Sequence, residues 1–140
     1  MKLKVYRPES TELPLPIFSS QVKAGFPSPA DDHIEEKLDL NHLMVEHPAA
    51  TFFLRVEGYS MENANIYPED ILVVDRALTA QDGQIVVAIL NGEFTVKRMK
   101  KDKECLFLLA ESPDFQPIKV TPETDFQVWG VVTFIIHKAR

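Results

Sequence analysis

The second half of the chain is dominated by short runs of β-branched and aromatic residues that alternate with turn-forming residues. Six such runs lie between residues 51 and 136: TFFLRVE, DILVVDR, QIVVAIL, EFTVKRM, CLFLLA and DFQVWGVVTFII. β-Branched and aromatic side chains favour strands, and Gly58, Pro68 and the QDG, NG and SPDF segments between the runs are turn signals. The pattern predicts a mainly β fold, a compact, twisted and partly barrel-like sheet with short helical turns.

Two glycine positions also predict local geometry. Asn91 and Gly92, in LNGEF, tolerate the positive φ angles of a type I′ turn and therefore predict a tight hairpin. Gly130 interrupts the long closing run at residues 126–136, and it predicts a β-bulge or a bend at that point.

The first thirty residues differ in composition from the rest of the chain. Prolines at positions 8, 14, 16, 27 and 29 remove backbone donors and favour extended backbone in the residues before them. Residues 1–30 are therefore expected to form an extended N-terminal arm, and residues 31–140 the β domain. Between Asp31 and Val45, the apolar residues Ile34, Leu38 and Leu43 allow a helical turn or two, and Asp39 is expected to cap a short helix through LNHLMV.

Length and composition fit one globular domain. The 140 residues are 45% hydrophobic, which is enough for a core, and they carry a formal net charge of −6. A negative chain is poorly suited to wrapping nucleic acid, because Lys and Arg must neutralise the phosphates. The sequence shows a single cysteine, Cys105, no run typical of a secretory signal and no apolar run long enough for a membrane span. A cytoplasmic protein is expected.

Common catalytic and metal-binding patterns are weak in this sequence. The four histidines and Cys105 lack the short spacings of zinc sites, so neither a metal site nor a cofactor is expected. GYSME, residues 58–62, resembles a nucleophile elbow only in part, because Glu62 stands where a second glycine belongs. A Ser/His/Asp triad through His47 or His137 stays open, since a triad is defined by geometry and not by chain order.

A better candidate pairs Ser60 with Lys97. Ser60 follows a predicted strand at a tight turn that contains Gly58, where backbone amides can face an oxyanion. Alternation along EFTVKRM places Thr95 and Lys97 on the same side of a strand, so either a charge points inward or the strand is an edge. Taken singly, each residue has an ordinary structural role, Ser60 in a turn and Lys97 on a solvated strand. The surrounding motifs decide between the two interpretations.

Four segments, in this order, resemble the LexA/UmuD family of self-cleaving serine-lysine peptidases: AGFPSP, FFLRVEGYSM, DGQIVVAILNGEFTVKRM and LLAESPDFQPI. The resemblance covers nearly all of the chain after Phe18. It implies that Ser60 is the nucleophile, that Lys97 is the general base and that the bond between Ala24 and Gly25 is cut. An Ala-Gly bond lies within the pattern of the family.

Within this family, the UmuD branch fits better than the repressor branch, because the residues before Gly25 are too few for a helix-turn-helix domain. The resemblance then implies that a RecA filament on single-stranded DNA stimulates cleavage in the SOS response to DNA damage. It also implies that the product from Gly25 onward is a homodimeric accessory subunit of an error-prone, UmuC-type translesion DNA polymerase.

Lys97 must be buried for this chemistry. A solvated lysine has a pKa of about 10.4, so only about one molecule in 2,500 is neutral at pH 7. Desolvation lowers that pKa and makes the amine a usable base for a serine hydroxyl. Ala24 and Gly25 carry almost no side chain, which lets the bond enter a closely fitted site. The tether from Gly25 to Ser60 spans on the order of 100 Å when extended, so cleavage within one chain and cleavage between subunits both stay open.

Other function classes also stay open. A non-enzymatic β-rich adaptor would use the arm only to regulate partner binding, and a general serine protease would need a specificity pocket that no motif supplies. The basic cluster KRMKKDK, residues 97–103, is either a nucleic-acid contact or a solvated hairpin end. Direct DNA binding is not expected.

Overall fold

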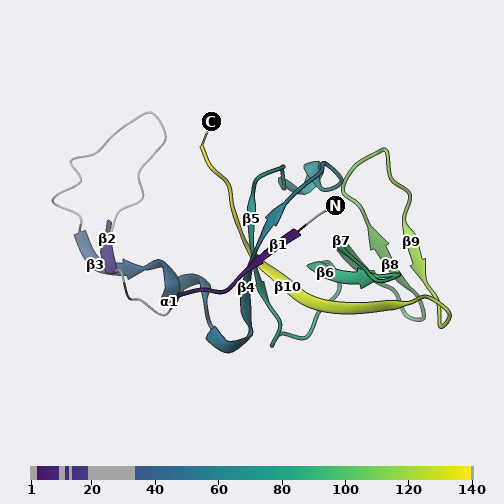
Figure 1. Ribbon diagram of the computed structural model, residues 1–140, viewed down its shortest axis with the longest axis horizontal. Coiled ribbons are helices and arrows are strands. Elements are labelled where there is room, and N and C mark those ends of the chain that lie inside the picture. The colour runs from purple at the N-terminus through teal and green to yellow at the C-terminus, as the bar shows by residue number, and fades with distance from the viewer. Residues whose placement is uncertain (1–2, 10–11, 13, 19–33, 140) are drawn as a thin grey trace.

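The computed structural model describes residues 3–9, 12, 14–18 and 34–139. Most of these residues are in strands, and the helical elements are short (Figure 1). In chain order the elements are β1 (Leu3–Tyr6), β2 (Pro14–Phe18), β3 (Ile34–Asp39), α1 (Leu40–Met44), η2 (Pro48–Ala50), β4 (Thr51–Val56), η3 (Glu62–Ala64), β5 (Ile71–Asp75), β6 (Ile85–Leu90), β7 (Glu93–Lys101), β8 (Leu106–Leu109), β9 (Ile118–Val120) and β10 (Phe126–Ile136).

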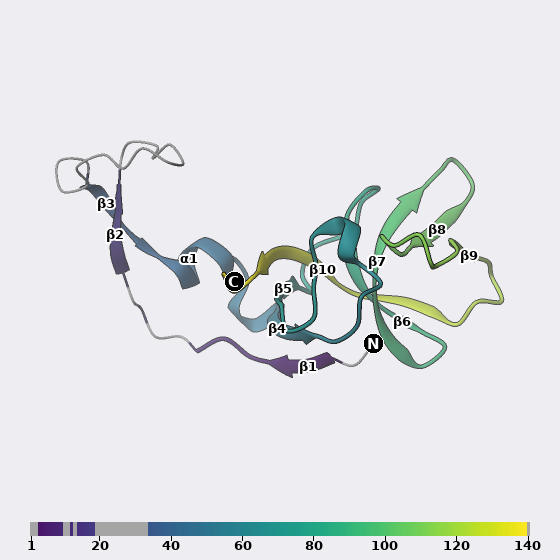
Figure 2. The same cartoon turned by 90° about the horizontal axis from the view of Figure 1, so that it is seen from above.

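Eight strands form one sheet in the order β1-β4-β5-β10-β6-β7-β8-β9, with every neighbouring pair antiparallel. The long strand β10 joins the two halves of the sheet, because residues 126–131 pair with β6 and residues 131–136 pair with β5. β10 curves through the middle of the molecule (Figures 1 and 2). The predicted mainly β class is confirmed, and the curved sheet stays open, with β1 and β9 at its edges.

The six predicted strand runs are all strands, namely β4, β5, β6, β7, β8 and β10. Asn91 and Gly92 have φ angles of 51° and 81°, as a type I′ turn between β6 and β7 requires. The register of β10 against β6 shifts between Val128 and Gly130, which confirms the irregularity predicted at this glycine.

The helical turn predicted around Ile34 and Leu38 is wrong. Both residues lie in β3, which pairs with β2 in a separate two-stranded sheet, and Leu38 stands opposite Leu15. The apolar spacing fits one face of a helix, but long-range strand pairing overrides such local patterns. The cap is confirmed, because α1 begins after Asp39 and the Asp39 carboxylate accepts the Asn41 N–H at 2.9 Å.

The β2–β3 ribbon and α1 lie at one end of the molecule, and β6 to β9 lie at the other (Figures 1 and 2). The sequence analysis did not predict the strands β1, β2 and β9. No helix among the described residues has the length and hydropathy needed to cross a bilayer.

The core lies on both faces of the sheet. Val86 and Val87, neighbours on β6, pack into different clusters, as strand alternation requires. Trp129 extends the larger cluster, because its ring lies 5.2 Å from that of Phe52 and 5.4 Å from that of Phe94. The buried members of the larger cluster are Leu54, Val56, Met61, Ile66, Leu72, Val74, Val87 and Val96, and those of the smaller one are Val86, Met99 and Val131.

Gly130 lies where β10 passes too close to β5 for a side chain. A Cβ at this position would stand 2.5 Å from Val74 Cγ1, and Val74 is fully buried in the core. We therefore expect Gly130→Ala to lower the free energy of unfolding by about 1–3 kcal/mol in urea denaturation. Val74→Ala should remove most of the effect of Gly130→Ala when the two are combined. Simple additivity of the two changes would contradict the steric explanation.

Candidate active site

Ser60 lies in a tight turn that follows β4. The turn begins at Gly58, whose φ of 97° suits glycine, and it continues into η3, which ends at the left-handed residue Asn65. Ser60 is 9% exposed and Met61 is 1% exposed. The turn therefore packs against the sheet and holds Ser60 at the edge of the buried interior.

Lys97 lies in the middle of β7, opposite Val86 of β6. The residue is 8% exposed, and its Nζ donates to Thr95 Oγ1 at 2.7 Å and to the Val96 carbonyl at 3.2 Å. Burial lowers the pKa of the Lys97 ammonium from its ordinary value of 10.5. Within the described part of the chain, no carboxylate forms an ion pair with Lys97 to oppose this effect.

Contacts around Glu111 tie the turn of Ser60 to β7. The Glu111 carbonyl accepts the Asn63 N–H at 2.8 Å, and the Glu111 N–H donates to Met61 Sδ at 3.4 Å. The carboxylate of the same residue forms an ion pair with Arg98. The turn that carries the candidate nucleophile is thus linked to the residue that follows the candidate base.

Burial on β7 supplies a second link between these segments. Met61, which follows Ser60, and Val96, which precedes Lys97, belong to the same buried cluster. The turn of Ser60 therefore packs on the face of β7 that carries Val96, whereas strand alternation places Lys97 on the other face, opposite Val86 of the smaller cluster.

Ser60 and Lys97 themselves are not hydrogen-bonded to each other among the residues that the structure describes, because the Lys97 amine bonds to Thr95 and Val96 instead. Ala24 and Gly25 lie outside the described residues. The Ser/Lys pairing and the position of the cut bond therefore stay predictions.

The two histidines of the alternative triad are paired with buried aspartates. His47 Nδ1 lies 2.6 Å from Asp75 Oδ2, and His137 Nδ1 lies 2.6 Å from Asp70 Oδ1. The hydrogen bond with Asp75 raises the pKa of His47, although desolvation opposes it. No serine hydroxyl within residues 34–139 bonds to either imidazole, so the geometry gives no support to a Ser/His/Asp triad.

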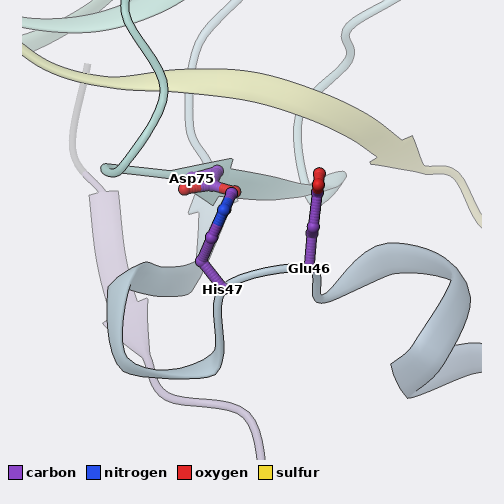
Figure 3. Close-up of side chains that lie close together, drawn as sticks. All are labelled: Glu46, His47 and Asp75. Carbon is purple, nitrogen blue, oxygen red and sulfur yellow. The ribbon is translucent and has the colours of Figure 1, made fainter.

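One cluster of potential metal ligands stands out. Glu46, His47 and Asp75 each offer a ligand atom, and these atoms lie within 4.8 Å of one another (Figure 3). Sequence analysis predicted no metal site, since these residues do not have the spacing of a known motif.

Sequence reasoning also missed the polar partners of the site residues. Thr95 was recoverable, because strand alternation places it on the same side as Lys97 two residues later. The two His–Asp pairs had no local signal, because their partners are 28 and 67 positions apart in the sequence.

Comparison with known proteins agrees with the resemblance found in the sequence. Residues 16–133 match the peptidase S24-like family. Protein ImpA of Salmonella typhimurium is 47% identical over 126 residues, which cover 89% of this chain and 85% of ImpA. Protein MucA of Escherichia coli is 45% identical over 121 residues, which cover 85% of this chain and 82% of MucA.

A longer relative shows the same similarity. The LexA repressor of Acidithiobacillus ferrooxidans is 44% identical over 132 residues, which cover 92% of this chain and 62% of the repressor. The chain therefore belongs to the peptidase S24-like family, and within it to the LexA/UmuD type of self-cleaving serine peptidases of the SOS response.

Proposed function

We propose that this protein cuts its own chain between Ala24 and Gly25, with Ser60 as the nucleophile and Lys97 as the general base. The observation that carries the proposal is the burial of Lys97, a residue that is 8% exposed, and this burial lowers the pKa of its amine. A buried lysine without a carboxylate partner is unfavourable for folding, and it is useful where a neutral amine is needed.

The chemistry follows from these roles. Neutral Lys97 Nζ takes the proton of Ser60 Oγ while this oxygen attacks the Ala24 carbonyl carbon, and turn amides near Gly58 stabilise the oxyanion. The Lys97 ammonium then gives its proton to the leaving Gly25 nitrogen. Water, activated by the same amine, hydrolyses the acyl group from Ser60. General-base catalysis contributes about 10² to 10⁴-fold, and positioning of the bond supplies much of the remainder.

Thr95 gives this mechanism a resting state. Its hydroxyl accepts a hydrogen bond from Lys97 Nζ at 2.7 Å, so the amine must turn from Thr95 toward Ser60 to act. A substrate tethered to its own catalytic site has a high effective concentration, and such a site needs a restraint before stimulation. The restraint is the need for two movements before cleavage: the Lys97 side chain must rotate away from Thr95, and the cleavage segment must dock.

The SOS role of the family supports a wider assignment. A RecA filament on single-stranded DNA stimulates cleavage by binding the docked arrangement more tightly than the undocked one. The product from Gly25 onward serves in the cytoplasm as a homodimeric accessory subunit of a UmuC-type polymerase in error-prone translesion synthesis. Direct DNA binding is not part of the assignment, because burial of Lys97 removes one charge from the basic cluster at residues 97–103.

The assignment is tested by incubating the purified protein at alkaline pH and determining the mass and the N-terminal residue of the products. The expected result is a fragment that begins at Gly25, together with the 24-residue peptide that precedes it. Ser60→Ala should stay whole, and Ser112→Ala, which changes a serine outside the turn, should be cut like the wild type.

Two results would favour the other function classes. A wild-type chain that stays whole both at alkaline pH and with a RecA filament would indicate a non-enzymatic adaptor. Digestion of unrelated proteins by the wild type would indicate a general serine protease.

A further inference from the structure

The segment between α1 and β4 crosses the end of β5 and brings together residues that are far apart in the sequence. The Arg76 N–H donates to the Ala50 carbonyl at 2.8 Å, and Thr51 pairs with Asp75 across the two strands. These contacts hold the segment beside the end of β5, where the His47 side chain points toward Asp75 and the Glu46 side chain extends alongside His47 (Figure 3).

Two of these three side chains are fixed in place. Asp75 is 3% exposed, and its Oδ1 accepts the Ala77 N–H at 2.8 Å, which turns Oδ2 toward the His47 ring 2.6 Å away. The Thr51 hydroxyl donates to the His47 carbonyl at 2.7 Å and fixes the backbone that carries the imidazole. An imidazole nitrogen and a carboxylate oxygen are thus preorganised side by side.

Glu46 supplies a third ligand that can move. Its side chain is exposed, and its carboxylate makes no hydrogen bond or ion pair with any other described residue. A ligand atom of Glu46 lies within 4.8 Å of those of His47 and Asp75. A rotation about its side-chain bonds brings this oxygen to a cation held between the other two.

We propose that Glu46, His47 and Asp75 form a binding site for a divalent transition-metal ion of the Zn²⁺ class. One imidazole nitrogen and two carboxylate oxygens make a three-ligand set, and the half-exposed His47 ring leaves the remaining position open to water. Ligands bound at about 2.1 Å in a tetrahedron are roughly 3.4 Å apart. The His47–Asp75 separation therefore opens by less than an ångström, and the proton between the two groups leaves to solvent.

The ligand types favour this class of ion over Mg²⁺. Mg²⁺ prefers six oxygen ligands in an octahedron, whereas zinc accepts mixed nitrogen and oxygen ligands with four positions. A bound ion would cross-link the segment from α1 to β5, so it should raise the thermal stability of the whole chain. The site uses neither Ser60 nor Lys97, so the test of the metal-site proposal does not depend on the peptidase assignment.

The chain contains its own control in the second His–Asp pair. His137 and Asp70 are also 2.6 Å apart, and their side chains are 42% and 2% exposed, against 40% and 5% for His47 and Asp75. In the part of the chain that the structure describes, no third metal ligand lies close enough to this second pair. If a third ligand is what makes the site, only the pair beside Glu46 binds metal.

Isothermal titration of the full chain with ZnCl₂ at pH 8, with thermal melts in parallel, tests the proposal. One saturable site is expected for the wild type and for His137→Gln, with a higher melting temperature in zinc. Glu46→Gln keeps the His47–Asp75 pair, so it should melt like the wild type without zinc and yet bind zinc at least tenfold more weakly. MgCl₂ should give no comparable binding.

The contrary results are equally specific. Absence of saturable zinc binding by the wild type would overturn the proposal. Unchanged affinity in Glu46→Gln, or loss of binding in His137→Gln but not in His47→Gln, would do the same.

Discussion

The rate of cleavage between Ala24 and Gly25, measured without a RecA filament, is expected to rise about tenfold for each pH unit above neutrality and then to level off. Only the neutral Lys97 amine can take the proton of Ser60, and below the pKa of a base its neutral fraction grows about tenfold per pH unit. Because burial lowers the pKa of Lys97, the plateau should begin at a lower pH than the ordinary value of 10.5.

The profile is measured by quantifying the fragment that begins at Gly25 at intervals from pH 7 to pH 11. Ser60→Ala should give no fragment at any pH, which excludes cleavage by hydroxide alone. Lys100→Met, which removes an exposed charge from the same strand, should keep the wild-type profile. A rate that stays flat between pH 7 and pH 10 would remove Lys97 from the role of general base.

Strand chemistry explains why much of the fold was predictable. The six long runs are rich in β-branched and aromatic residues, which favour strands. The turn between β6 and β7 needs positive φ angles, which Asn91 and Gly92 adopt and few other residue types tolerate. β9 is only three residues long, so it carries too little pattern to recognise. β3 formed where a helix was expected, because its pairing with β2 depends on a partner that local spacing does not reveal.

The candidate site was predictable in its residue types and not in its contacts. Strand alternation left two alternatives, a buried Lys97 or an edge strand. The sheet order places β7 between β6 and β8, which excludes the edge strand, and packing on the face of the sheet buries Lys97. The link through Glu111 depends on how the turn after β4 packs against the residues that follow β8. The periodic spacing of apolar residues in the sequence does not reveal this contact. The sequence therefore specified the reacting groups, and tertiary packing specified their surroundings.

Lys97→Met is expected to abolish measurable cleavage and, at the same time, to make the protein more stable. Loss of a general base lowers the rate by about 10² to 10⁴-fold. Methionine has a similar length and no charge, so it fills the same buried space without the desolvation penalty of an ammonium. We expect the free energy of unfolding at pH 7 to increase by about 0.5–2 kcal/mol, in the range typical of substitutions that trade activity for stability.

The pH dependence of this gain distinguishes desolvation from better packing. The pKa of Lys97 is lower in the folded chain than the ordinary 10.5, so burial of the ammonium destabilises the fold fully below the folded pKa. That destabilisation disappears as the pH rises through the folded pKa toward 10.5, where the amine is neutral in both states. The stability advantage of Lys97→Met over the wild type should therefore shrink between pH 7 and pH 10 in urea denaturation. Lys100→Met should show no such advantage at either pH. A stability gain of Lys97→Met that does not change with pH would assign the effect to packing. The Lys97 ammonium would then lack the desolvation penalty that its role as a general base requires.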